Sequence, residues 1–408
     1  MADSWASLNI LLLNQAFYPD VVATAQYASD LAGQLVERGH TVTVIASRRG
    51  YADPSLTFPW SETWRGVRIL RCPASGFGKA ARWRRALDFA SFFVACAARA
   101  AVLSRFDAVV ALTSPPMVSA LGVVVARMNG ARFIYWVMDL NPDEAIAAGW
   151  LKPTSRVTRA LNAMLSFSLR HSDQVVVLDR FMATRLAQKG VPAGKLNVIP
   201  LWSQDDVVSN DPEAAAEFRK KHGLENKFVV MYSGNHSPCH PLDTLLEAAR
   251  KLRDFTDIAF CFVGGGSEFA RVRKFASEHG LTHIHCIGYQ PLTKLAASLS
   301  SADLHAVVMG DAFVGIVHPS KVYNIRRVGT PFFYIGPQIS PVAELMPAVS
   351  FRHGDAEGVA AFILKAARQG LPNASHESNK FARHQLLDQL ISTIGGQPRP
   401  AVPDPVRG

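Results

Sequence analysis

The chain has few cysteines, little charge and no long apolar run, and each shortage excludes a class of protein. Only 19% of its 408 residues are charged and 49% are hydrophobic, which is typical of a globular chain with large cores. Its five cysteines form no C-x-x-C pair and their number is odd: Cys72, Cys96, Cys239, Cys261 and Cys286. A metal centre or a disulfide framework is therefore not expected, and a reducing compartment fits.

Segments that would direct the chain across a membrane are also missing. No stretch of about eighteen uncharged apolar residues occurs, and the nearest one, 86–103, contains Asp88 and Arg99. The N-terminus has no cationic start followed by an uninterrupted apolar segment, so we expect no signal peptide. A cytoplasmic protein follows, with or without peripheral contact at the inner face of the cell membrane.

Two nucleotide-binding motifs are absent as well. No G-x-x-x-x-G-K-[ST] occurs, which excludes a P-loop kinase or ATPase. No G-x-G-x-x-G opens the chain, which disfavours a dinucleotide-dependent dehydrogenase.

Short apolar runs alternate with helical patterns along the chain, and this alternation predicts an α/β fold. Residues 8–13 and 41–46 are expected strands around a helix at 25–38, with Thr24 as its cap. Similar units follow as far as residue 199, and a second series begins at 228. Open parallel sheets bind ligands at the carboxyl ends of their strands, so the loops there are the candidate sites.

Composition divides the chain into two α/β domains. We predict a first domain at 1–202, a polar linker region at 203–226 and a second domain at 227–375. A C-terminal helix at 376–395 is expected to pack back, and the Pro- and Gly-rich tail, 396–408, is expected to be disordered.

A basic, aromatic and amphipathic segment, 79–105, stands out in the first domain. Lys79, Arg82, Arg84 and Arg85 surround Trp83 and precede an apolar helical pattern, and the net charge of the chain is +10. Such a helix can lie on an anionic membrane. It can equally pack its apolar face into the core, with the basic residues at the rim.

Three loops at predicted strand ends in the second domain suit a phosphate-bearing ligand. Gly234 and the triplet Gly264–Gly266 let the backbone approach a ligand closely. In the third loop, Pro319 precedes Ser320 at a predicted helix N-cap, and Lys321 follows. Helix N-termini bind anions, and a lysine adds a positive charge. The alternative is that Ser320 only caps the helix and Lys321 is an ordinary solvated residue.

Taken together, these segments resemble bacterial glycosyltransferases of family four, and the resemblance covers almost the whole chain. Residues 8–46 look like the opening unit of that family and 232–249 like the entry to its donor domain, and 260–266 and 318–331 are similar to its donor loops. The nearest subgroup is the colanic-acid or exopolysaccharide type. The resemblance implies two facing Rossmann-like domains with a cleft between them, the GT-B architecture, and retention of configuration.

The resemblance also assigns roles to residues. Asp139 and Lys321 would be catalytic, with Lys321 at the donor diphosphate. The implied donor-binding residues are Thr24, Gly234, Asn235, Gly264, Gly265, Gly266, Pro319, Ser320, Lys321, Tyr323 and Asn324. No metal and no cofactor is implied, and the substrate would be a UDP- or GDP-linked sugar. The implied partners are that donor and a glycan or polyprenyl-diphosphate-linked saccharide. The pattern of 79–105, and not the resemblance, suggests a peripheral contact with an anionic membrane, and no nucleic-acid partner is expected.

Four departures from the family pattern weaken the donor assignment. The usual pair of glutamates is missing, and Asn324 stands where the second glutamate would bind a ribose. Arg326 and Arg327 replace small residues, Ala23 replaces the glycine of the first loop, and Ser237 and Pro241 replace further glycines.

The predicted activity is hexosyl transfer from a nucleoside-diphosphate sugar to a glycan, in exopolysaccharide, capsule or O-antigen biosynthesis. The departures leave a second hypothesis open, a degenerate subunit that binds an active transferase at the membrane. A sugar-nucleotide epimerase and a nucleic-acid binder are further alternatives, the latter suggested by charge alone.

Overall fold

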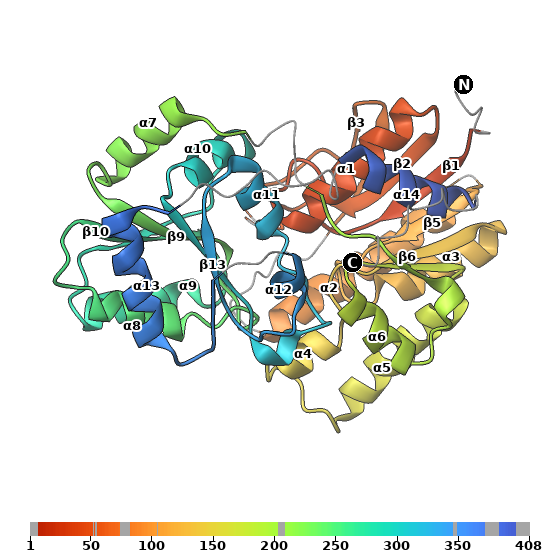
Figure 1. Cartoon of the computed structure of the whole chain (residues 1–408). Helices are drawn as coiled ribbons and strands as arrows, with labels where there is room; N and C mark the ends of the chain where they lie inside the picture. Colours follow the sequence, from red (N-terminus) through yellow and green to blue (C-terminus); the bar gives the residue numbers. More distant parts are fainter. Residues whose placement is uncertain are drawn as a thin grey trace, which may run out of the picture. The chain divides into compact units, whose positions relative to one another are not determined.

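The computed structural model describes residues 7–51, 53, 55–73, 82–103, 105–202, 209–345, 349–371 and 383–396, with the backbone alone for 82–86. They form two compact units (Figure 1). The first contains the described residues up to Pro200 and those from His384 onward, and the second runs from Leu201 to Arg383.

Unit 1 is built on an eight-stranded sheet in the order β3-β4-β2-β1-β5-β6-β7-β8. All of its neighbouring strands are parallel except the edge pair β3 and β4. The strands are β1 Asn9–Leu13, β2 Thr41–Ser47, β3 Ser61–Trp64, β4 Val67–Cys72, β5 Ala108–Ala111, β6 Arg132–Trp136, β7 Gln174–Val177 and β8 Leu196–Val198.

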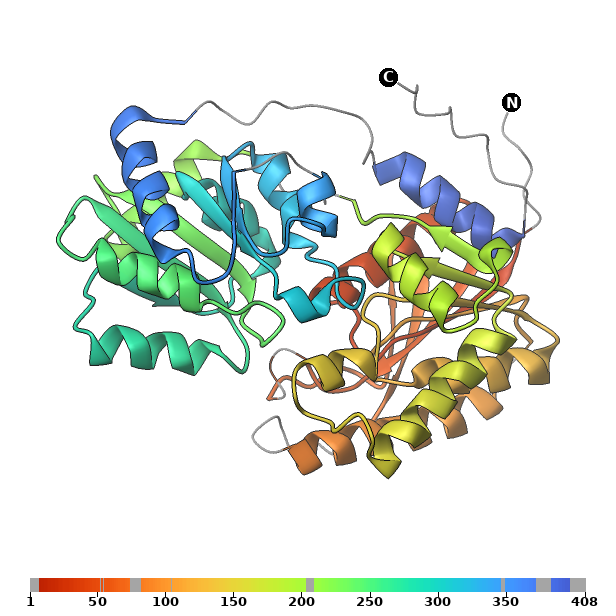
Figure 2. The ribbon, with the colours of Figure 1, turned by 60° about the horizontal axis from the view of Figure 1, so that its bottom comes forward.

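Helices cover both faces of this sheet (Figure 2). They are α1 Ala23–Glu37, α2 Arg82–Ala101, α3 Val118–Asn129, α4 Asp143–Ala147, α5 Arg156–His171, α6 Arg180–Gln188, the 3-10 turn Ala193–Lys195 and α14 Arg383–Gly395. Helix α2 packs beside α3, and α3 beside α5. An ion pair joins Arg38, just after α1, to Asp388 of α14. Right-handed crossovers place α1 on one face and α2, α3 and α5 on the other.

Unit 2 is built on a six-stranded parallel sheet in the order β11-β10-β9-β12-β13-β14. Its strands are β9 Phe228–Asn235, β10 Ile258–Gly265, β11 Ile284–Ile287, β12 Leu304–Val308, β13 Phe332–Ile335 and β14 Ser350–Phe351. Its helices are α7 Pro212–His222, α8 Asp243–Lys251, α9 Phe269–Glu278, α10 Leu295–Ser300, α11 Lys321–Val328, α12 Pro341–Leu345 and α13 Ala356–Gln369, with 3-10 turns at Leu292–Lys294 and Asp311–Phe313.

The strands are short and apolar because both faces of each sheet are buried. In unit 2, Phe260, Phe262 and Val308 are at most 1% exposed and belong to one core cluster with residues of α8 and α13. The predicted α/β class with two Rossmann-like domains is confirmed.

Several details differ from the sequence-based expectations. Helix α7 lies within 203–226, the range expected to be a linker, and packs against α10 of unit 2. The helix expected at 376–395 is observed as α14, which belongs to unit 1. The tail beyond residue 396 lies outside the described residues. Among the described helices, none is long and apolar enough to cross a bilayer.

Candidate functional site

The glycines at the carboxyl ends of β9 and β10 let two backbones lie in close contact. Gly264 pairs with Gly234, and Gly265 pairs with Asn235. Gly234, Gly264 and Gly266 have φ values of about +130°, which side-chain-bearing residues rarely adopt. A Cβ atom on Gly264 would lie 2.1 Å from the carbonyl oxygen of Gly234. These glycines are therefore required by the packing of the two strand ends.

Hydrogen bonds hold the two glycine loops together. The N–H group of His236 donates to the carbonyl of Gly265 at 2.7 Å, and the N–H of Glu268 donates to the carbonyl of His236 at 3.0 Å. The hydroxyl of Tyr289 donates to the carbonyl of Gly265 at 3.1 Å. The side chain of Asn235, an exposed residue, lies close to Gly266, where a Cβ would be 2.4 Å from its Oδ1 atom.

The third loop ends at the corner where α11 begins. Pro319 is buried and Ser320 is the N-cap residue, as predicted, but its side chain makes no capping hydrogen bond. A hydrogen bond of 2.8 Å joins His318 Nε2 and the Tyr323 hydroxyl, two buried groups, and ties the loop to the first turn of the helix. The N-terminus of α11 is thus held in place while its first N–H groups are left without a side-chain cap.

Lys321, the first residue of α11, is the most unusual group at this corner. Its Nζ atom is buried without a hydrogen-bond partner, 3.7 Å from the centre of the Tyr232 ring. A Cβ on Gly234 would lie 3.2 Å from the same atom. Burial lowers the pKa of Lys321 to about 7. The alternative of an ordinary solvated lysine is therefore wrong, and a buried cation without a partner suits an anion.

Neutral histidines surround this cation. Burial, and then the charge of Lys321, lower the pKa of His236 to about 4 and that of His240 to about 3. Burial is also the main cause that lowers the pKa of His305 to about 4. His236 Nδ1 lies 3.0 Å from the carbonyl oxygen of Gly234, and His240 Nδ1 lies 2.7 Å from that of Val308. These rings add polar groups to the corner without adding charge at neutral pH.

The remaining donor-binding candidates of unit 2 lie on α11 itself. Asn324 is half-buried and follows Lys321 by three residues, which places both on one side of the helix. Tyr323 is buried, and its hydroxyl is engaged by His318. Arg326 and Arg327 lie in the last turn, where their charge complements the helix dipole.

Thr24, the candidate of unit 1 nearest the N-terminus, is not the helix cap that the sequence predicted. Helix α1 begins at Ala23, and the N-cap is Val22, which is extended and offers no side-chain bond. The carbonyl of Val22 accepts hydrogen bonds from Ala25 and Gln26, and the Gln26 side chain donates to Val21. Helix α1 begins at Ala23, two residues before the predicted start at residue 25, and Thr24 therefore lies in its first turn.

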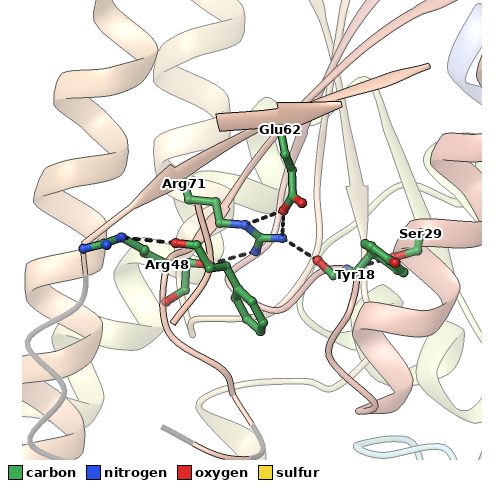
Figure 3. A network of polar contacts seen from close by, with 7 residues as sticks. Tyr18, Ser29, Arg48, Glu62 and Arg71 are labelled. Atoms are coloured by element: carbon green, nitrogen blue, oxygen red, sulfur yellow. Dashed lines mark hydrogen bonds and ion pairs between the residues drawn. The ribbon is translucent and has the colours of Figure 1, made fainter. Parts of the chain in front are cut away.

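A buried arginine holds the loop that leads to α1 (Figure 3). Arg71 of β4 is 1% exposed and donates to the carbonyl of Tyr18 at 2.6 Å and to that of Ser47 at 3.1 Å. Its Nε also donates to Glu62 at 3.0 Å. The N–H of Tyr18 in turn donates to Ser29 Oγ at 3.0 Å. The loop is thereby tied to β4, β2 and α1.

Asp139 follows β6 and carries a perturbed carboxyl group. Burial, and then the charge of Glu144 on α4, raise the pKa of Asp139 to about 8. Asn141 donates to Glu144 at 3.1 Å and so holds the second carboxylate. At neutral pH Asp139 is therefore mostly protonated and can donate a hydrogen bond, which an ordinary aspartate cannot.

The structure brings the candidates of unit 2 together and places Thr24 and Asp139 in unit 1. Sequence reasoning missed Tyr232, His236 and Arg71. For His236 a signal existed, because it directly follows the Ser-Gly-Asn loop. In the described part of the chain, no group of three His, Cys, Asp or Glu residues is placed to hold a metal ion.

Two family models match the chain, one in each unit. Residues 23–202 match the Glycosyl transferase 4-like domain, and residues 214–318 match Glycosyl transferases group 1. The chain belongs to the family-four glycosyltransferases of the GT-B fold. The epimerase and nucleic-acid-binding alternatives have no support from these matches.

Two relatives of this glycosyltransferase are named for different biosynthetic products. It is 28% identical to the putative colanic acid biosynthesis glycosyl transferase WcaI of Escherichia coli K12, over 95% of this chain and 100% of that protein. It is 26% identical to the GDP-mannose-dependent α-(1-6)-phosphatidylinositol monomannoside mannosyltransferase of Mycobacterium tuberculosis H37Rv, over 73% of this chain and 72% of that protein.

Solved structures share the fold of this glycosyltransferase. HepE of Anabaena in complex with UDP-glucose aligns with a TM-score of 0.71 at 15% identity, covering 95% of this chain and all of that one. WaaG, a glycosyltransferase involved in lipopolysaccharide biosynthesis, aligns with a TM-score of 0.66 at 14% identity, over 95% of this chain and all of that one.

Proposed function

We propose that this glycosyltransferase moves a hexosyl group from a nucleoside-diphosphate sugar, UDP- or GDP-linked, to a glycan hydroxyl with retention of configuration. The acceptor we propose is a lipid-linked saccharide, in exopolysaccharide, capsule or O-antigen biosynthesis. The observation that carries the proposal is the buried Nζ atom of Lys321, which has no hydrogen-bond partner and lies beside Gly234.

A diphosphate meets the chemical needs of this corner. It supplies negative charge and acceptor oxygens for Lys321, and it would lie at the N-terminus of α11, where the helix dipole favours an anion and Ser320 makes no side-chain cap. The positive-φ glycines at the carboxyl ends of β9 and β10 leave that end of the sheet free of bulky side chains. Asn324, on the Lys321 side of α11, can donate to or accept from a ribose hydroxyl, although without the charge assistance of a glutamate.

The reaction needs charge stabilisation where the leaving group departs. The bond between the anomeric carbon and the diphosphate oxygen breaks, and a bond from the acceptor oxygen forms on the same face of the sugar. The proton of the acceptor hydroxyl passes to the leaving diphosphate. Lys321 and the N-terminus of α11 would stabilise the negative charge that grows on that diphosphate.

For Asp139 we propose a hydrogen bond to a sugar hydroxyl. Its raised pKa keeps the proton on the carboxyl at neutral pH, so it is suited to donate rather than to act as a base. Thr24, in the first turn of α1, is the second residue of unit 1 that we assign to the substrates.

The relatives support this choice of substrates. WcaI is named for colanic acid biosynthesis, the mycobacterial relative is named for its dependence on GDP-mannose, and HepE was solved with UDP-glucose. These names include both UDP and GDP, so the nucleotide must be found by measurement.

The test is a thermal-shift screen against UDP, GDP, ADP and dTDP, with Lys321→Ala as the site variant. Ligands that bind the folded state raise the melting temperature by mass action. Lys274→Ala is the matched control, because Lys274 is an exposed lysine of the same unit that pairs only at the surface with Glu278.

We expect one nucleotide to raise the melting temperature of the parent protein and of Lys274→Ala, and to leave that of Lys321→Ala unchanged. If no nucleotide shifts the parent protein, the donor site as described is refuted, and a non-catalytic partner of another transferase becomes the better explanation.

A further inference from the structure

Tyr232 lies on β9 two residues before Gly234, so both residues are on the same side of the strand. The Nζ atom of Lys321 lies 3.7 Å from the centre of the Tyr232 ring and 3.2 Å from the place that a Cβ atom on Gly234 would take. The ring therefore lies against the charged head of the lysine, and the missing side chain of Gly234 leaves the room that this head occupies.

The orientation of the Tyr232 ring is fixed by its surroundings. Tyr232 is 1% exposed, its hydroxyl donates to the carbonyl of Asn235 at 2.8 Å, and the His236 ring packs against it edge to face, with 4.9 Å between the ring centres. Burial, and then the neighbouring Tyr289 and Cys239, raise the pKa of Tyr232 well above its ordinary value. The group is thus a neutral phenol, with its oxygen bonded to the loop and its face turned to the lysine.

No acid offsets the charge of Lys321 in the part of the chain that the structure describes. Burial lowers its pKa to about 7, and its Nζ atom has no hydrogen-bond partner. The titratable groups around it are His236 and His240 from the loop after β9 and His305 from β12, and all three are neutral at pH 7. The arginines of α11 lie in its last turn. The attraction between a cation and an aromatic face is therefore the contact that favours the charged form of Lys321.

We infer that Tyr232 is a positioning residue of the donor site, whose ring holds the charged head of Lys321 at the Gly234 end of β9 for the diphosphate. The inference rests on the proposed function for the identity of the anion, and on the geometry for the role of the ring. Tyr232 acts through Lys321, because its own hydroxyl is engaged by Asn235 and its face by the lysine. Without the ring the neutral amine is favoured, and a diphosphate meets less positive charge.

The first test is a pH titration of Lys321 in the ligand-free full chain. Nuclear magnetic resonance of protein labelled with ¹³C at the lysine Cε atoms follows the charge, and Lys321→Met identifies the signal. We expect Tyr232→Leu to lower the midpoint of this titration by about one pH unit, which corresponds to a desolvated contact between a cation and a ring. Tyr232→Phe keeps the ring and should keep the midpoint.

The second test is the affinity for UDP and GDP at pH 6 and pH 8. For the nucleotide that binds, the dissociation constant of Tyr232→Leu should exceed that of the parent about tenfold at pH 8 and less than about twofold at pH 6, because at pH 6 much of Lys321 is charged in both proteins. Phe262→Leu is the matched control, since Phe262 is a buried ring of the neighbouring strand β10 and its loss leaves the Lys321 contact in place. Any weakening in this control should be equal at the two pH values.

Fluorinated phenylalanines at position 232 test the contact without a change of shape, and they serve if Tyr232→Leu does not fold. Fluorine withdraws electrons from the face of the ring and so weakens its attraction for a cation. The midpoint of the Lys321 titration should fall stepwise from Tyr232→Phe to a trifluorinated and then a pentafluorinated ring at the same position.

Two results would overturn the inference. The first is a midpoint that Tyr232→Leu and the fluorinated rings leave unchanged. The second is a loss of affinity in Tyr232→Leu that is equal at pH 6 and pH 8, which indicates a merely structural role. A shifted midpoint in a protein that binds no nucleotide would refute the proposed function and not the contact between ring and lysine, so the two failures are distinguishable.

Discussion

The Nζ atom of Lys321 lies over the face of the Tyr232 ring, 3.7 Å from its centre, and has no hydrogen-bond partner. The ring attracts the cation but offers no acceptor atom. The cation is thus positioned without being neutralised, and a bound anion would remove the cost of its burial.

The first prediction is that nucleotide affinity depends on pH through Lys321. Its pKa is about 7, so above that pH an increasing fraction of the free protein lacks the charge. The dissociation constant of the nucleotide found in the screen should rise about tenfold per pH unit between about pH 7 and pH 9. A terminal phosphate titrates near pH 6, below this window.

The control is Lys321→Met, which should bind weakly and without this slope. His236, His240 and His305 have pKa values of about 4, 3 and 4, so they stay neutral throughout the window. Isothermal titration at several pH values provides the measurement. A parent slope equal to that of Lys321→Met would show that Lys321 is not the group that titrates.

The second prediction concerns the stability of the ligand-free protein. The folded-state pKa of Lys321, about 7, is below its ordinary value of 10.5, so between these values the unfolded state binds more protons and stability rises with pH. Below pH 7 Lys321 is protonated in both states, so the desolvation of its buried charge lowers the free energy of unfolding by the full amount. Lys321→Met should therefore stabilise unit 2 at pH 6, by on the order of 2 kcal/mol, and by less at pH 9.5.

Urea unfolding in a buffer without phosphate measures this difference. A variant that is less stable than the parent at pH 6 would mean that the contact with Tyr232 outweighs the cost of burial.

The third prediction is that Gly264 tolerates no side chain. A Cβ there would lie 2.1 Å from the Gly234 carbonyl oxygen, and φ is +129°. Gly264→Ala should cost about 3 kcal/mol of unfolding free energy and abolish the nucleotide thermal shift. Gly280→Ala is the control, because Gly280 has a φ of +61° and open space around its Cβ position, so about 1 kcal/mol is expected. Equal costs for the two variants would contradict the close approach of the strands.

The fourth prediction is that the Asp139 carboxyl acts as a hydrogen-bond donor and not as a base. Its folded-state pKa of about 8 is raised above the ordinary 3.8, so the proton is retained up to about pH 8 and lost above it. Asp139→Asn keeps a donor and should retain activity within about threefold, without the decline that the parent shows above pH 8. Asp139→Ala should lose about tenfold or more. Initial rates against pH decide it, and an inactive Asp139→Asn would indicate that the carboxylate acts as a base.

The fifth prediction is that Arg71 stabilises unit 1. Arg71→Met leaves the carbonyls of Tyr18 and Ser47 without their donor and Glu62 without its partner, at a cost of about 3 kcal/mol. Hydrogen exchange at the Tyr18 amide should accelerate as the loop loosens. Arg68 is an exposed residue of the same strand, so Arg68→Met should change neither the free energy of unfolding nor the exchange rate of the Tyr18 amide. Unchanged exchange in Arg71→Met would show that other contacts hold the loop.

The sequence by itself determined the alternation of strands and helices, the two units and the position of the phosphate-type loops. These features depend on local patterns, because period, glycine and proline act within a few residues. The cap of α6 is equally local, because the Asp179 side chain accepts a hydrogen bond from the N–H of Met182, three residues further on. The prediction that Thr24 caps α1 was wrong because the N-cap residue is Val22, which has no capping side chain and accepts hydrogen bonds only through its backbone carbonyl.

Only the tertiary structure decided how the site groups behave. Lys321 is buried over Tyr232, a residue 89 positions earlier, and Arg71 holds a loop 53 residues away, so neither environment is visible in a local pattern. The periodicity of α2 indicated an apolar helix, but the fold selects which side meets the sheet and which side is left exposed. Burial and proximity between distant segments set charge states and open surfaces, and these arise only when the chain is folded.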